Sequence, residues 1–136
     1  MGAVYVKVQL SNATDVELAE QGLLERAEVR SCQVEALVDT GANRSILPTD
    51  IVERLGLRIR RQATGTLADG SRVSCGVCSG VLFKIDDRET LEDAYVMGDT
   101  VLVGQTVLQS TDLLVDCSNH RVIPNPAHPE GPVFRF

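Results

Sequence analysis

The sequence has 136 residues, of which 43% are hydrophobic, 24% are charged and 4% are aromatic, and its net charge at pH 7 is −6. This length predicts one domain, and the apolar content excludes a disordered chain. The 13 Lys and Arg residues form no long block, which argues against a nucleic-acid-binding surface, and no apolar run approaches the roughly 20 residues that span a bilayer. The opening MGAVYVKVQL does not resemble a signal peptide, so we expect a soluble, cytoplasmic protein that binds neither nucleic acid nor membranes.

The first half of the chain predicts two strands and a helix. In chain order, these are a strand at residues 3–10, a polar segment at 11–25 that is interpreted equally well as a short helical turn or a loop, a strand at 29–38 and a helix at 48–55. Val4, Val6 and Val8 alternate with other residues, as they do in a half-buried strand. Pro48 is tolerated in the first turn of a helix and Gly56 can end one, which sets the bounds of the predicted helix.

The second half predicts mostly β-structure. In chain order, we expect a long hairpin at 65–85, a strand at 94–103, a helical turn at 104–109 and a short strand at 113–115. Asp69-Gly70 supplies the hairpin turn, because both residue types tolerate the positive φ angles of a tight two-residue turn. Val81, Phe83 and Ile85 alternate along the returning arm, which predicts a strand with one buried face.

The most informative stretch is Asp39-Thr40-Gly41. An apolar strand end precedes it and Ala42 follows it, as an acid held rigidly at the floor of a cleft requires. The tripeptide alone is weak evidence, because average composition produces it by chance in on the order of a few per cent of chains this long. Without its flanks, Asp39 would be interpreted as a strand-to-turn exit that accepts hydrogen bonds from the following amides.

With these flanks, the sequence resembles the retropepsin-like aspartic proteases, and most closely their small cellular bacterial members. Three segments carry the resemblance in order: Asp39-Thr40-Gly41-Ala42, then Thr66-Leu67-Ala68-Asp69-Gly70-Ser71, then Leu102-Val103-Gly104-Gln105 with Leu108 and Asp112-Leu113. The resemblance implies a mainly β, retropepsin-like acid protease fold, which is a closed, barrel-like domain with a flap hairpin and one or two short helices. It also implies an aspartic endopeptidase that needs no metal and no other cofactor.

The resemblance assigns roles to individual residues. Asp39 would be the catalytic acid, in a loop completed by Thr40, Gly41 and Ala42. Thr40 would donate a hydrogen bond across a dimer axis, and Gly41 would let the substrate backbone approach closely. The substrate-binding flap would comprise Leu67, Ala68, Asp69, Gly70 and Ser71, and the supporting residues would be Asn43, Gly104 and Gln105.

The chemistry of this family constrains the assembly. Two carboxylates must share one proton, so that one accepts a proton from the attacking water while the other donates a hydrogen bond to the amide carbonyl. The chain holds one Asp-Thr-Gly, because Asp69-Gly70-Ser71 has a different order and lies in a turn. We therefore expect a homodimer that pairs two copies of Asp39 and takes a peptide or protein substrate.

The sequence departs from the viral members of the family at two places. Those proteins pair an acid with an arginine where this chain has Asn43 and Gln105, whose amides could keep a hydrogen bond without charge. They also end in short strands, whereas this domain, expected over residues 1–123, continues into a tail at 124–136 with four of the five prolines. Such a tail cannot run as a central strand. The tail could pack around the partner copy, or its aromatic end could lie in a cleft as an internal pseudo-substrate.

The sequence also leaves two alternative functions open. A catalytically weak or silent dimeric module that binds peptides is the main alternative, since one fold can serve several functions. Four residues with the spacing of two zinc half-sites, Cys75, Cys78, Cys117 and His120, suggest a zinc cluster, which the alternation of side chains along a strand opposes. Arg58, Arg60 and Arg61 form a small basic cluster that we interpret as a solubilising surface.

Overall fold

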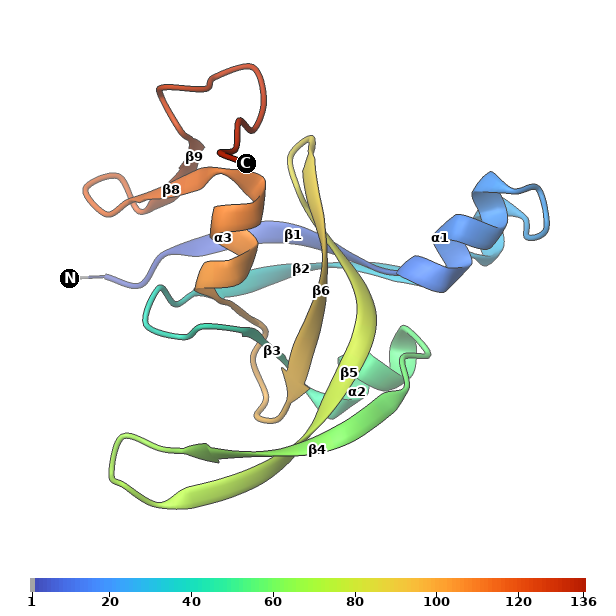
Figure 1. Ribbon diagram of the computed structural model, residues 1–136, viewed down its shortest axis with the longest axis horizontal. Helices are drawn as coiled ribbons and strands as arrows, with labels where there is room; N and C mark the ends of the chain where they lie inside the picture. The colour runs from blue at the N-terminus through green and yellow to red at the C-terminus, as the bar shows by residue number, and fades with distance from the viewer. Residues whose placement is uncertain (1) are drawn as a thin grey trace.

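The computed structural model describes residues 2–136 and is mainly β (Figure 1). Its strands are β1 (Tyr5–Asn12), β2 (Ser31–Val38), β3 (Ser45–Leu47), β4 (Ile59–Thr66), β5 (Arg72–Ile85), β6 (Arg88–Val96), β7 (Leu102–Val103), β8 (Leu113–Asp116) and β9 (Arg121–Pro124). Its helices are α1 (Ala13–Glu20), the single 3-10 turn η1 (Arg26–Glu28), α2 (Thr49–Arg54) and α3 (Gln105–Thr111).

Seven of these strands form one sheet in the order β1-β2-β7-β3-β6-β5-β4. Strand β1 also pairs with β5, which closes the sheet into a ring and leaves β4 attached outside it. The pairs β2–β7 and β3–β6 are parallel, whereas the other pairs within this sheet are antiparallel. Strands β8 and β9 form a separate two-stranded sheet. The closed, mainly β ring with short helices confirms the expected retropepsin-like fold.

The core fills the inside of the ring. The alternation predicted for the first strand is confirmed at Val8 and Leu10, which are fully buried. The long strand β5 contributes Val81, Phe83 and Ile85 from one of its faces, also as predicted. A face that supplies an apolar side chain at every second residue needs a packed interior on that side, and this requirement fixes the register of the strand.

Helix α1 resolves the alternative that the sequence leaves open at residues 11–25. Asn12 precedes the helix, and its side chain accepts a hydrogen bond from the backbone N–H of Asp15. Asp15 is itself buried and accepts bonds from Nε and Nη2 of Arg30 at 2.8 and 2.9 Å. The helix is therefore stabilised by polar contacts at its first turn, which apolar periodicity does not reveal.

The strand predicted at 94–103 is wrong as one element. Strand β6 begins earlier, at Arg88, and ends at Val96, while β7 contains only Leu102 and Val103. Between them the chain turns, and Gly98 takes a φ of 70° that redirects the backbone. This turn allows β7 to lie between β2 and β3 instead of extending β6.

The β4–β5 hairpin also differs from the prediction in its turn and its length. The first arm begins at Ile59, before the expected start at residue 65. The backbone N–H of Leu67 donates to the carbonyl of Ser71, which leaves a three-residue loop between them. Only Gly70 of this loop has a positive φ, at 86°, so the expected two-residue turn with positive angles at both Asp69 and Gly70 is wrong. The Asp69 side chain instead accepts a bond from the N–H of Ser71, a local turn that needs no left-handed residue at Asp69.

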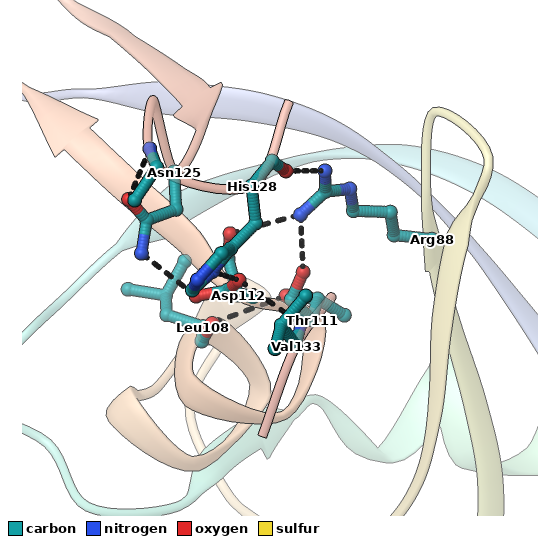
Figure 2. A network of polar contacts seen from close by, with 8 residues as sticks. Arg88, Leu108, Thr111, Asp112, Asn125, His128 and Val133 are labelled. Carbon is teal, nitrogen blue, oxygen red and sulfur yellow. Dashed lines mark hydrogen bonds and ion pairs between the residues drawn. The ribbon is translucent and has the colours of Figure 1, made fainter. Parts of the chain in front are cut away.

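The tail after β9 folds back onto its own chain (Figure 2). The carboxylate of Asp112 accepts hydrogen bonds from Nδ2 of Asn125 at 3.0 Å and contacts Nδ1 of His128 at 2.6 Å. The buried guanidinium of Arg88 donates to the carbonyl oxygens of Thr111, Asp112 and His128. The aromatic end of the tail is exposed.

The helices within residues 2–136 are all too short or too polar to span a membrane.

Candidate active site

Asp39 lies directly after β2, where the chain leaves the ring. Its backbone N–H donates to the carbonyl of Val103 in the parallel neighbour β7 at 2.9 Å. Its side chain is partly exposed. Because the strand before it is fixed in the sheet, the carboxylate is carried by a rigid element and still reaches solvent.

The loop after Asp39 orients its carboxylate. The N–H of Gly41 donates to Oδ1 of Asp39 at 2.9 Å, and the N–H of Ala42 donates to the carbonyl of Asp39 at 3.2 Å. A Cβ atom on Gly41 would lie 3.2 Å from Oδ1, so a larger residue would press on the carboxylate. Thr40 and Gly41 are both exposed at the surface of this turn, and Ala42 is partly buried.

The start of α3, which contains the predicted supporting residue Gln105, lies against the Asp39 loop although the two segments are distant in the sequence. The N–H of Gln105 donates to the carbonyl of Ala42 at 2.8 Å, and the N–H of Thr106 donates to the carbonyl of Asn43 at 3.0 Å. The start of α3 is therefore bonded along the backbone of the Asp39 loop. The backbone of Gln105 is bonded to Ala42 and that of Asn43 to Thr106, and no hydrogen bond in the described part of the chain joins the side-chain amides of Asn43 and Gln105.

Gly104 allows the two segments to touch. A Cβ atom there would lie 2.6 Å from the carbonyl carbon and oxygen of Arg44, and 3.0 Å from the carbonyl oxygen of Ala42. Contacts this short with backbone atoms are not tolerated, so the crossing needs a residue without a side chain.

Ser45 is a site residue that sequence reasoning missed. It is 1% exposed, and its Oγ accepts a hydrogen bond from the N–H of Gly104 at 2.9 Å. A buried backbone N–H without a partner is costly, and this hydroxyl satisfies it. The available signal was a serine on the same face as the apolar Leu47, where a polar side chain needs a specific partner.

The predicted flap residues lie at the exposed tip of the β4–β5 hairpin. In Figure 1 this tip projects from the same side of the molecule as the loop between β2 and β3 that carries Asp39. Hydrogen bonds to the Ser71 hydroxyl and N–H lower the pKa of Asp69, which keeps its carboxylate charged in the turn. Among residues 2–136, no hydrogen bond links the hairpin tip to the Asp39 loop, so the structure brings together the loop and its supports but leaves the tip free.

A small cavity of about 160 Å³, here called the flap recess, lies along the hairpin. Its apolar lining includes Leu67 and Val73 from the hairpin, together with Tyr95 near the end of β6 and Met97 just after it. Cys75 also contributes to the lining. The flap recess is thus a small, largely apolar cavity.

The alternative zinc cluster has no support in this arrangement. Cys78 is fully buried in β5 and its Sγ lies 3.5 Å from the carbonyl oxygen of Ala94, while Cys117 is exposed in the turn after β8. Within residues 2–136, no three His, Cys, Asp or Glu side chains are grouped to hold a metal ion.

The family is decided by a comparison with known proteins. A family model described as aspartyl protease matches residues 26–107, more than half of the chain. The chain belongs to the aspartyl protease family. The matched residues include the Asp39 loop, the β4–β5 hairpin and the Gly104 crossing, so this retropepsin-like protein has a protease-like function. Comparison with curated proteins finds no match.

Proposed function

We propose that this aspartyl protease family member is an endopeptidase in which Asp39 from two copies of the chain forms the catalytic dyad. The observation that carries the proposal is the Asp39 loop itself. Its carboxylate is partly exposed, oriented by the N–H of Gly41 and attached to the sheet through Val103. An acid that is fixed in position and open to solvent can act on a water molecule beside a peptide bond.

The reaction divides two roles between two identical groups. One Asp39, ionised, removes a proton from the attacking water, and the other, protonated, donates a hydrogen bond to the amide carbonyl. Two carboxyl groups in contact cannot both ionise cheaply, so the pair titrates as a unit. Each chain supplies one Asp-Thr-Gly loop, which supports a homodimer built around a two-fold axis at Asp39.

The substrate lies extended between the Asp39 loops and the flap in this proposal. Backbone groups of the Leu67–Ser71 tip pair with the peptide, as sheet-forming recognition requires. The flap recess, with its volume of about 160 Å³ and its contacts from Tyr95 and Met97, accepts an apolar side chain of the substrate. We therefore expect cleavage sites with an apolar residue near the cut bond.

The test is cleavage of a mixed peptide library at several pH values between about pH 4 and pH 8, so that the pH dependence of the cleavage rate is recorded as well. Wild-type protein is compared with Asp39→Asn, and both proteins are sized in the same buffers. We expect the substitution to lower the cleavage rate by roughly 100-fold or more, because it removes the proton acceptor. Both proteins should remain dimers.

A charge-matched control separates the role of Asp39 from a general effect of charge. Asp87→Asn changes an exposed carboxylate in the turn between β5 and β6 and should leave cleavage unchanged. Equal cleavage by wild type and Asp39→Asn would contradict the proposal. A wild-type dimer that binds peptides without cutting them would instead identify the silent binding module.

A further inference from the structure

A second cavity lies away from the Asp39 loop, where the base of the β4–β5 hairpin meets the body of the domain. It is open, has a volume of about 370 Å³, and is here called the root cavity. Its polar lining residues include Thr14, Arg30, Arg58, Arg60 and Ser79. Its volume lies in the range of about 300 to 1,000 Å³ that is typical of small-molecule sites. The root cavity is therefore large enough for a ligand.

The lining of the root cavity is positively charged in a chain whose net charge is −6. None of its lining residues is acidic. Arg30 is compensated, because it is paired with the buried Asp15 at 2.8 Å. Within residues 2–136, neither Arg58 nor Arg60 has a carboxylate within the 4.0 Å of an ion pair. Two guanidinium charges consequently remain uncompensated at one cavity.

Irregularities in both hairpin strands shape this cavity. Arg60 is the extra residue of a β-bulge, because Ile59 pairs with Cys78 and Arg61 pairs with Val77. Such a bulge redirects side chains and is often found beside functional sites.

Strand β5 is irregular at the same place. Ser79 and Gly80 have no partner in the register of any described strand, and Gly80 has a φ of 79°. Ser79 therefore lines the root cavity beside the bulge of the neighbouring strand.

We propose that the root cavity binds a small phosphorylated molecule by its phosphate group. The planar guanidinium groups of Arg58 and Arg60 match the geometry of phosphate oxygens, and the hydroxyls of Thr14 and Ser79 supply neutral donors. The cavity exceeds the size of a phosphate ion, which leaves room for the organic part of a phosphate monoester. The site is independent of Asp39 and of proteolysis.

The experiment is isothermal titration of the full chain with inorganic phosphate and, separately, with glycerol 2-phosphate, at low and constant ionic strength. The titrations are made at about pH 8, well above the second pKa of a phosphate monoester (about 6), so that both ligands are mostly dianions. We expect saturable binding with one site per chain. Tighter binding of glycerol 2-phosphate supports a monoester ligand, whereas equal affinities support recognition of the phosphate group alone.

Three neutral variants assign the site. Arg58→Gln and Arg60→Gln should each weaken binding by about tenfold or more, because each removes charge-assisted hydrogen bonds. Arg61→Gln is the matched control, since Arg61 is adjacent, exposed and outside the cavity lining, and it should bind like wild type. Absence of saturable binding, or equal loss in all three variants, would overturn the proposal. Circular dichroism of each variant checks that it is folded.

Discussion

Gly104 lies against the backbone of the loop that carries Asp39. Its position is fixed from two directions, since its N–H donates to the buried Ser45 hydroxyl and its Cα faces the Arg44 carbonyl. A small residue is needed here because of a close approach between segments about 60 residues apart, and its φ of −91° is open to any residue. The geometry of the candidate site therefore depends on the missing side chain of Gly104 as much as on Asp39.

Replacing Gly104 should destabilise the domain and disturb the site together. Gly104→Ala places a Cβ 2.6 Å from backbone atoms of Arg44, so we expect a loss of about 1–3 kcal/mol in the free energy of unfolding. Urea denaturation measures this loss. Gly131→Ala is the control, because no atom beyond its chain neighbours lies within 4 Å of its added Cβ, so the free energy of unfolding should not change. Equal stability of the two variants would show that the Arg44 contact relaxes without cost.

Ser45 supplies a second prediction at this scale. Ser45→Ala removes the acceptor for the N–H of Gly104, which leaves a buried donor unpaired and should cost about 1–3 kcal/mol. Thermal unfolding followed by circular dichroism measures the effect. Ser118→Ala, in the exposed turn after β8, is the control and should have the same melting temperature as wild type. If Ser45→Ala also has the melting temperature of wild type, the N–H of Gly104 forms a hydrogen bond with another acceptor in the variant.

Helix α1 is attached to the ring by polar contacts at the scale of elements. Asn12 caps the helix and donates from Nδ2 to the carbonyl of Leu55, at the end of α2. Asp15 in the first turn binds Arg30, just before β2, through both side chain and backbone. These bonds join α1 to two elements that are far from it in sequence, which explains a stable helix of eight residues with little apolar periodicity.

The Asp15–Arg30 contact predicts a pH dependence. Hydrogen bonds from Arg30 hold the pKa of Asp15 below its ordinary value of 3.8 in the folded state. A lowered pKa stabilises the fold above the unfolded pKa, and this stabilisation is lost as the pH falls through the folded pKa. At pH 7, Asp15→Asn should therefore be less stable than wild type by about 1–3 kcal/mol.

Urea denaturation of both proteins from neutral to acidic pH measures the difference. The gap in unfolding free energy should be constant at neutral pH and should narrow below the ordinary pKa of aspartate. Other carboxylates with lowered pKa values titrate in both proteins and cancel in the comparison. A gap that stays constant on acidification would show that the charge of Asp15 contributes nothing.

The whole molecule is a closed ring with an appended tail that its own chain holds. Closure through β1 and β5 joins the two ends of the sheet, while Arg88 and Asp112 attach the tail beside α3 (Figure 2). Asn125 and His128 lower the pKa of Asp112, so its carboxylate remains charged and able to hold both side chains. The first part of the tail is thus fastened to its own chain, while Phe134 and Phe136 stay exposed.

Loss of the Asp112 carboxylate should release the tail without unfolding the ring. In Asp112→Ala the bonds to Asn125 and His128 disappear, so we expect amide exchange over residues 125–133 to become faster, while exchange in β5 is unchanged. Hydrogen exchange with mass spectrometry measures both regions. Exchange that rises equally in β5 would mean that Asp112 stabilises the whole domain.

The sequence predicted what depends on local pattern and on motif. Alternation located β1 and the buried face of β5, and the Asp39 loop and its three-segment order indicated the family that the comparison confirms. The sequence did not predict contacts between distant residues. No local pattern indicates that Ser45 contacts Gly104 or that Asp15 contacts Arg30. The tight turn at Asp86 was also missed, because a non-glycine residue with a φ of 55° lacks the usual signal.

Strand β4 is the last strand in the sheet order and pairs only with β5. One side of it consequently presents unpaired backbone groups, which in other proteins template association with a further strand. Arg60 and Arg61 lie at the start of this strand, and Arg58 lies just before it, so three like charges are placed where the strand begins. Two such edges approaching each other would bring these charges together. Together with Arg61, the two arginines that line the root cavity therefore also protect the protein against edge-to-edge aggregation.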